Sequence, residues 1–115
     1  MSKKIFLLAV FACLIILAGC NLYSSTPTAS TTPVQGNTVT ISNFTFTPSV
    51  LEVTAGTKVT WKNNDSAGHK VVSTNLFEGP VINQGEEYSF TFTNPGSYDY
   101  FCQIHPSMTG KVIVK

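Results

Sequence analysis

The sequence predicts a small all-β domain, a sandwich or barrel of short strands, and three observations support this prediction. Apolar and polar residues alternate with a period of two in several short runs that are rich in β-branched and aromatic residues. Turn-forming Gly, Pro and Asn residues separate these runs at intervals of roughly 8–12 residues, the spacing typical of sandwiches and barrels. Between these turns, no segment shows helical periodicity over a useful length.

The expected strands follow one another along the C-terminal two thirds of the chain. The alternation predicts strands over residues 39–46, 50–53, 58–62, 69–72, 88–92, 98–102 and 112–114. Pro48, the turn at Ala55-Gly56, the loop over residues 63–68 and the turn at residues 94–96 separate them. The aromatic side chains of the runs are expected in the core: Phe44, Phe46, Trp61, Phe90, Phe92, Tyr98 and Tyr100.

The first 20 residues read as an export signal rather than as part of the fold. Lys3 and Lys4 precede an unbroken apolar run over residues 5–18, which is too short to span a bilayer comfortably. The run ends in Leu-Ala-Gly-Cys20, which resembles the lipobox of prokaryotic lipoproteins. That resemblance implies a signal peptide over residues 1–19 and lipidation of Cys20. An ordinary signal peptide and an uncleaved anchor remain the alternatives.

The chain then divides into a spacer and one domain. Residues 20–37 are rich in Ser, Thr and Pro and contain no charge, so they are expected to form a flexible spacer after the lipidated cysteine. A glycosylated stalk is the alternative. Residues 38–115 form the expected domain, with a monomer as the default state. The protein is therefore expected outside the cytoplasm, lipid-anchored to the membrane and facing the periplasm or the cell exterior.

Length and charge exclude several functional classes. The whole chain has 115 residues and can build only one modest core, so a multidomain enzyme is excluded. Seven Lys and no Arg stand against six acidic residues, and after residue 19 the balance is five Lys to six acids. No basic patch is available for nucleic acid.

One cluster of residues near the C-terminus points to metal chemistry. Under the lipoprotein interpretation Cys102 is the only free cysteine of the mature chain, which excludes an internal disulfide. Cys102, His105 and Met108 follow one another at three-residue spacing, and His69 is the only other histidine. Two imidazoles, one thiolate and a thioether are the donor set of a blue-copper electron-transfer site. Taken singly, these residues also fit a buried inert Cys, solvated loop histidines and a core Met.

The ordered pattern of residues resembles the cupredoxins, the blue-copper proteins similar to plastocyanin and amicyanin. The residues that carry the resemblance are Phe44, Phe46, Pro48, Leu51, Val53, Gly56, Val59, Trp61, Asn63, His69, Gly96, Tyr98, Tyr100, Cys102, His105, Met108, Gly110 and Val112. The resemblance implies a Greek-key β-sandwich with one type 1 copper ion at one end. It makes His69, Cys102 and His105 the strong ligands and Met108 the axial one. Lys70 departs from the pattern, since many members have Asn after the first ligand histidine.

The expected function is single-electron transfer, with copper cycling between Cu(II) and Cu(I). Four protein ligands leave no open coordination position, which indicates a carrier rather than an enzyme. The expected partners are redox proteins and, through the lipid anchor, the membrane. The alternatives are an extracytoplasmic copper-binding carrier or sequestration lipoprotein, which needs the same residues, and an inert β-sandwich module that has lost its metal.

Overall fold

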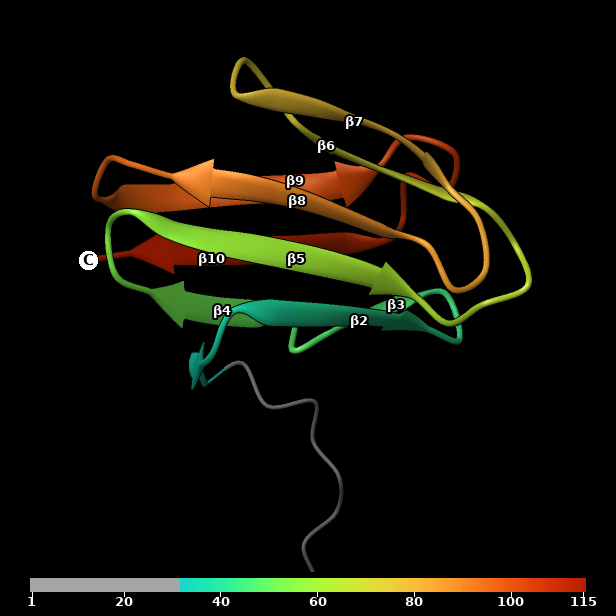
Figure 1. Ribbon diagram of the computed structural model, residues 1–115, viewed down its shortest axis with the longest axis horizontal. Helices are drawn as coiled ribbons and strands as arrows, with labels where there is room; N and C mark the ends of the chain where they lie inside the picture. The colour runs from blue at the N-terminus through green and yellow to red at the C-terminus, as the bar shows by residue number, and fades with distance from the viewer. Residues whose placement is uncertain (1–31) are drawn as a thin grey trace, which may run out of the picture.

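The computed structural model describes residues 32–115, which form ten β-strands and their connecting turns (Figure 1). No helix occurs in this part of the chain, so the all-β prediction is confirmed. The strands are β1 (Val34–Gln35), β2 (Thr38–Ser42), β3 (Thr45–Thr47), β4 (Val50–Val53), β5 (Thr57–Asn63), β6 (His69–Ser73), β7 (Phe77–Ile82), β8 (Glu87–Phe92), β9 (Gly96–Cys102) and β10 (Thr109–Val114).

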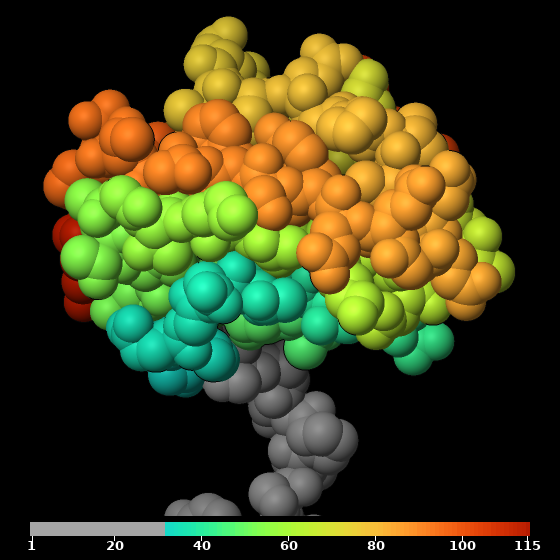
Figure 2. Space-filling model, in the orientation of Figure 1, coloured from blue at the N-terminus to red at the C-terminus, as the bar shows by residue number. Residues whose placement is uncertain are grey.

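The strands form two sheets that pack face to face as a sandwich (Figure 1). One sheet has six strands in the order β1-β4-β10-β9-β6-β7, and the other has four in the order β3-β2-β5-β8. Three pairs are parallel, β1 with β4, β4 with β10, and β2 with β5, and the other pairs are antiparallel. Figure 2 shows the face over the four-stranded sheet, where β8 (orange), β5 (green) and the chain around β2 (cyan) lie side by side.

The core fills the space between the sheets and follows the alternation in the sequence. In each central strand every second side chain points inward, as the expected period of two requires. Trp61 lies at the centre, with aromatic rings of four other residues around it. The buried apolar residues are Val39, Ile41, Phe46, Leu51, Val53, Val59, Trp61, Val71, Phe77, Ile82, Phe92, Tyr100, Cys102, Met108, Val112 and Val114.

Strand β7 is an element that the sequence pattern did not predict. Its segment contains Gly79 and Pro80, which normally argue against a strand. The structure places β7 at the edge of the six-stranded sheet, where a proline is tolerated. A side chain at Gly79 would press against the ring of Tyr88 at 3.0 Å, so the glycine permits this close packing. Gly79 and Pro80, which interrupt the alternating pattern, therefore lie in an edge strand rather than in a loop.

The amino-terminal predictions fall mostly outside the part of the chain that the structure describes. The expected signal peptide and the lipidation site Cys20 lie before residue 32. Of the expected spacer, Val34 and Gln35 form β1, which pairs in parallel with β4. Among residues 32–115 there is no helix of sufficient length and hydrophobicity to span a bilayer.

Several connections that matter for function gather at one end of the sandwich. The turn between β2 and β3, the loop after β5 and the loop after β9 all lie opposite the end that carries the C-terminus (Figure 1). These connections contain or flank the predicted ligands, because β6 begins at His69 and β9 ends at Cys102. The fold therefore brings together residues that are more than 30 positions apart in the sequence.

Replacing Gly110 with alanine is expected to destabilise the domain by about 3 kcal/mol, at the upper end of the usual cost of overpacking. Gly110 lies opposite Tyr100 in the β9–β10 pair, and a methyl group at Gly110 would overlap the phenol of Tyr100. Tyr100 cannot move aside, because it is buried against the rings of Phe46 and Trp61. Thermal unfolding of the copper-free protein measures the effect.

Gly36→Ala is the matched control. A methyl group at Gly36 would meet only a side-chain carbon of Leu51, at an ordinary contact distance of 3.6 Å. This variant should have the same melting temperature as the wild-type protein, because surface substitutions usually change stability very little. Equal melting temperatures for the Gly36 and Gly110 variants would contradict the assigned packing of Tyr100.

Candidate metal centre

Three side chains that the sequence predicts as metal ligands converge at one end of the sandwich. His69 begins β6, Cys102 ends β9, and His105 lies in the loop that follows. Strands β6 and β9 are neighbours in the sheet, with Val71 opposite Cys102, and this register places His69 beside the cysteine. The Nδ1 atoms of His69 and His105 lie 3.7 Å and 3.8 Å from Cys102 Sγ, and the three ligand atoms all lie within 4.8 Å of one another.

The three donors differ in their access to solvent. His69 and Cys102 are completely buried, whereas His105 is half-buried. The buried pair is held by two strands of the sheet, and the loop brings the third donor over them from the outside. The imidazole of His105 is therefore the part of the cluster that an approaching molecule reaches first.

Met108 lies at the end of a tight loop that begins at Cys102. The N–H of Cys102 donates to the carbonyl of Met108 at 3.0 Å, and the N–H of Met108 donates to the carbonyl of His105 at 2.9 Å. The loop thus returns beside its starting point, and the Met108 side chain is buried in the adjoining core. Its position fits the predicted axial role, which stays a prediction.

A carboxylate that sequence reasoning missed fixes the orientation of His69. Asp65 Oδ2 lies 3.0 Å from His69 Nε2, on the side of the ring away from Cys102. A carboxylate can only accept, so the shared hydrogen belongs to Nε2, and the lone pair of Nδ1 faces the cluster. Such an arrangement of carboxylate, imidazole and metal position is common in protein metal sites. The available signal was an acidic residue four positions before a candidate ligand histidine.

The surroundings of Asp65 favour its ionised form. Burial raises the pKa of this carboxyl, but hydrogen bonds from the Phe44 N–H, the His69 ring and the Asn43 N–H outweigh burial and hold the pKa below its usual range. Asn63 orders the same loop, because its buried side chain accepts from the Asp65 N–H and donates to the carbonyls of Ala67 and Ile82. A negative charge is therefore built in directly behind His69.

The assignment of Phe44 to the core was wrong. Its side chain is 51% exposed, and both Asn43 and Phe44 have left-handed backbone conformations, which take this residue out of the alternating pattern. The ring of Phe44 instead packs edge-on against the two histidines, 5.4 Å from the centre of the His69 ring and 5.0 Å from that of His105. Phe44 thus forms part of the rim of the cluster.

Lys70, the departure from the pattern, contacts the ligand loop through its backbone. The Lys70 N–H points at Cys102 Sγ at 3.5 Å, and the Lys70 carbonyl accepts from the Gln103 N–H at 2.8 Å. The side chain extends the other way and pairs with Glu78 at 2.6 Å. The hydrogen bond to sulfur therefore does not depend on the side chain at this position, and such bonds tune the potential of blue-copper sites.

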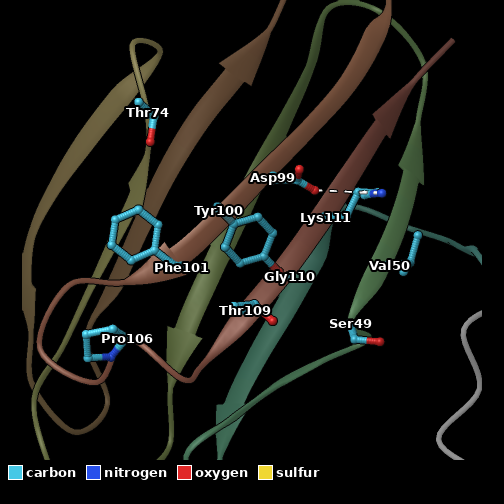
Figure 3. Close-up of a pocket in the computed structure, with 10 residues that line it drawn as sticks. All are labelled: Ser49, Val50, Thr74, Asp99, Tyr100, Phe101, Pro106, Thr109, Gly110 and Lys111. Atoms are coloured by element: carbon cyan, nitrogen blue, oxygen red, sulfur yellow. Dashed lines mark ion pairs between the residues drawn. The ribbon is translucent and has the colours of Figure 1, made fainter.

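A groove of roughly 580 Å³ lies beside the cluster, on the outer side of the six-stranded sheet (Figure 3). It runs along β9 and β10, with Phe101 and Pro106 toward the ligand loop. Asp99 and Lys111 lie opposite each other in the β9–β10 pair and form an ion pair at 3.7 Å on the wall of the groove. None of the three clustered donors lines this groove, so it is separate from the candidate metal centre.

The donor set fits one copper ion. A thiolate and a thioether are soft donors that suit Cu(I), and imidazole suits both oxidation states. Zinc also accepts Cys and His, although the intrinsic order of affinities favours Cu²⁺ over Zn²⁺. Three strong donors with an adjoining thioether are the donor types of sites in which copper changes between Cu(II) and Cu(I).

Comparison with known proteins agrees with this chemistry. The family model described as a cupredoxin-like domain matches residues 10–114. Amicyanin-alpha of Methylorubrum extorquens is 36% identical over 90 residues, which cover 72% of this chain and 75% of the relative. The solved structure of an oxidised amicyanin variant matches with a TM-score of 0.66 at 36% identity, over 68% of this chain and 80% of that one. A copper-containing nitrite reductase from Thermus scotoductus matches with a TM-score of 0.64 at 36% identity, over 68% of this chain and only 22% of that one.

Proposed function

The chain belongs to the cupredoxin family, and we propose that it is a single-electron carrier with one type 1 copper ion. The proposed ligands are His69, Cys102, His105 and Met108. The observation that carries the proposal is the convergence of two imidazole nitrogens and one thiol sulfur within 4.8 Å of one another. When bound, copper supplies a reversible one-electron change between Cu(II) and Cu(I).

The residues around the site hold the proposed ligands in place while the copper changes charge. His69 and Cys102 are buried on neighbouring strands, and Asp65 braces His69 from behind. A site that is held in this way can change charge with little movement of its donors. Because catalytic metal sites keep a coordination position open, the full ligand set supports a carrier and argues against an enzyme.

The end of the domain around His105 is the proposed contact with redox partners. The loop over residues 103–107 carries no charge, and Ile104 and Phe44 are exposed beside the half-buried imidazole. A small uncharged patch suits a brief encounter, since electron-transfer complexes bury little surface. With no net attraction to steer the partners, association should depend only mildly on salt.

The amino-terminal segment supports a location outside the cytoplasm. We infer a signal peptide over residues 1–19, a lipid on Cys20, a spacer that ends where β1 begins at Val34, and the copper domain after it. The basis is the order of charged, apolar and small residues before Cys20. A lipid and a flexible spacer would raise the effective concentration of the monomeric carrier near membrane-bound partners at the periplasmic or outer face.

The experiment that tests electron transfer separates it from copper delivery. The copper-loaded protein is reduced and reoxidised repeatedly in the presence of a strong Cu(I) chelator, and the visible absorption is followed. A carrier of electrons should recover its full absorption after every cycle, because the buried donors retain Cu(I). Stoichiometric transfer of Cu(I) to the chelator within a few cycles would contradict electron transfer and support a copper carrier.

A further inference from the structure

The turn between β2 and β3 adopts a conformation that its residues do not favour. Asn43 and Phe44 have φ angles of 51° and 54°, in the left-handed region. Asn visits this region fairly often, but a bulky aromatic residue rarely does. Such conformations persist only where the surroundings hold them, and they cluster at functional sites.

Asp65 provides the contacts that hold this turn. Its Oδ1 accepts from the Asn43 N–H at 2.7 Å, and its Oδ2 accepts from the Phe44 N–H at 2.9 Å. The same Oδ2 accepts from His69 Nε2 at 3.0 Å. One carboxylate, with a side chain only 12% exposed, therefore joins the strained turn to a predicted copper ligand.

This bridge has consequences on both of its sides. On the His69 side it places hydrogen on Nε2 and leaves Nδ1 free to face Cys102 Sγ. On the turn side it keeps the ring of Phe44 edge-on against His69 and His105. The backbone N–H of Asp65 donates to the side chain of Asn63, so this bridge is anchored to a buried residue at the end of β5.

We propose that Asp65 is a positioning residue of the copper site, which sets the tautomer of His69 and holds Phe44 over the two imidazoles. This inference rests on the proposed function and extends it, because it adds a residue that acts on copper through His69. A purely structural role, in which Asp65 only stabilises the turn, predicts no effect on the tautomer or on copper affinity in a folded variant.

The test compares Asp65→Asn with Asp99→Asn as the matched control. An asparagine side chain offers one acceptor oxygen and an NH₂ donor, whereas three N–H groups now share two carboxylate oxygens. At least one of the three N–H groups therefore loses its acceptor. Asp99→Asn removes the same charge from an exposed ion pair with Lys111, which lies outside the cluster.

Two readouts are measured for each protein. Nitrogen-15 NMR of the copper-free protein at mildly alkaline pH reports which ring nitrogen of His69 carries hydrogen. Competition with a chelator reports copper affinity. The wild type and Asp99→Asn should show His69 protonated on Nε2. The Asp65→Asn variant should show a larger share of the Nδ1-protonated tautomer, with a copper affinity lower by about 10- to 100-fold.

Two results would overturn the proposal. One is a wild-type protein with His69 protonated mainly on Nδ1, and this measurement needs no variant and no copper. The other is a folded Asp65→Asn protein with the tautomer and copper affinity of Asp99→Asn. Failure of the proposed function itself would appear differently, as a wild-type protein that shows the expected tautomer yet binds no copper.

Discussion

The Cys102→Ser variant is expected to lose the intense visible absorption of the copper-loaded protein and to bind Cu(I) more than about 100-fold less tightly, since even outer-shell partners contribute 10- to 100-fold. The absorption requires a thiolate bound to copper, and a serine hydroxyl is neither soft nor readily deprotonated. Cys102 Sγ lies at the centre of the cluster, within 3.8 Å of both histidine nitrogens. Absorption spectra and chelator competition measure the two effects.

Ser107→Ala serves as the control for this variant. Ser107 is exposed in the same loop but is not among the predicted ligands, so its replacement should leave the absorption and the copper affinity unchanged. The copper-free Cys102→Ser protein should remain folded, because serine is smaller than cysteine. Retention of the absorption by Cys102→Ser would rule out the proposed thiolate ligand.

Replacing Trp61 with alanine is expected to destabilise the copper-free domain by about 3–5 kcal/mol, the usual cost of removing a buried Trp or Phe. Trp61 is completely buried, and its ring contacts the rings of Phe77, Tyr88, Phe92 and Tyr100. For a domain of this size the melting temperature should fall by roughly 12–40 °C. Thermal unfolding without copper isolates the effect, since a ligand that binds only the native state raises stability.

Trp61→Phe is the matched variant. It keeps an aromatic ring in the core among the rings of Phe77, Tyr88, Phe92 and Tyr100. Phenylalanine leaves a smaller cavity than alanine does, so the phenylalanine variant should lose less than half as much stability as the alanine variant. Equal losses for the two variants would show that aromatic packing around residue 61 is not what stabilises the sandwich.

Most of the fold could be predicted because its strands share one pattern, in which apolar and polar residues alternate with a period of two. Strands such as β5 and the second half of β9 alternate between buried residues and residues that are more exposed, and turns that contain Gly or Pro separate the strands. The three donors of the cluster could be predicted for a different reason. Cys and His are rare in this chain, and Cys102 and His105 are so close in sequence that one loop must bring them together.

The features that could not be predicted depend on contacts between distant segments. In the sequence Phe44 alternates with Phe46 as a strand residue would, and only the hydrogen bonds to Asp65, 21 residues away, show why it lies in a turn and faces outward. Asp65 itself looks like an ordinary loop residue until the fold places the β2–β3 turn beside it. Strand β7 was missed because Gly79 and Pro80 are acceptable only at a sheet edge, and edge position is a property of the assembled sheet.

Titration of the purified protein with Cu(II) shows whether it holds the one blue-copper site that a single-electron carrier needs. Absorption and electron paramagnetic resonance are recorded together. The intense thiolate-to-copper absorption should grow linearly and saturate at one equivalent. A single Cu(II) resonance should accompany it, with the small hyperfine splitting that delocalisation onto sulfur produces. Tight binding of copper without that absorption, or saturation at a different stoichiometry, would contradict the proposed site.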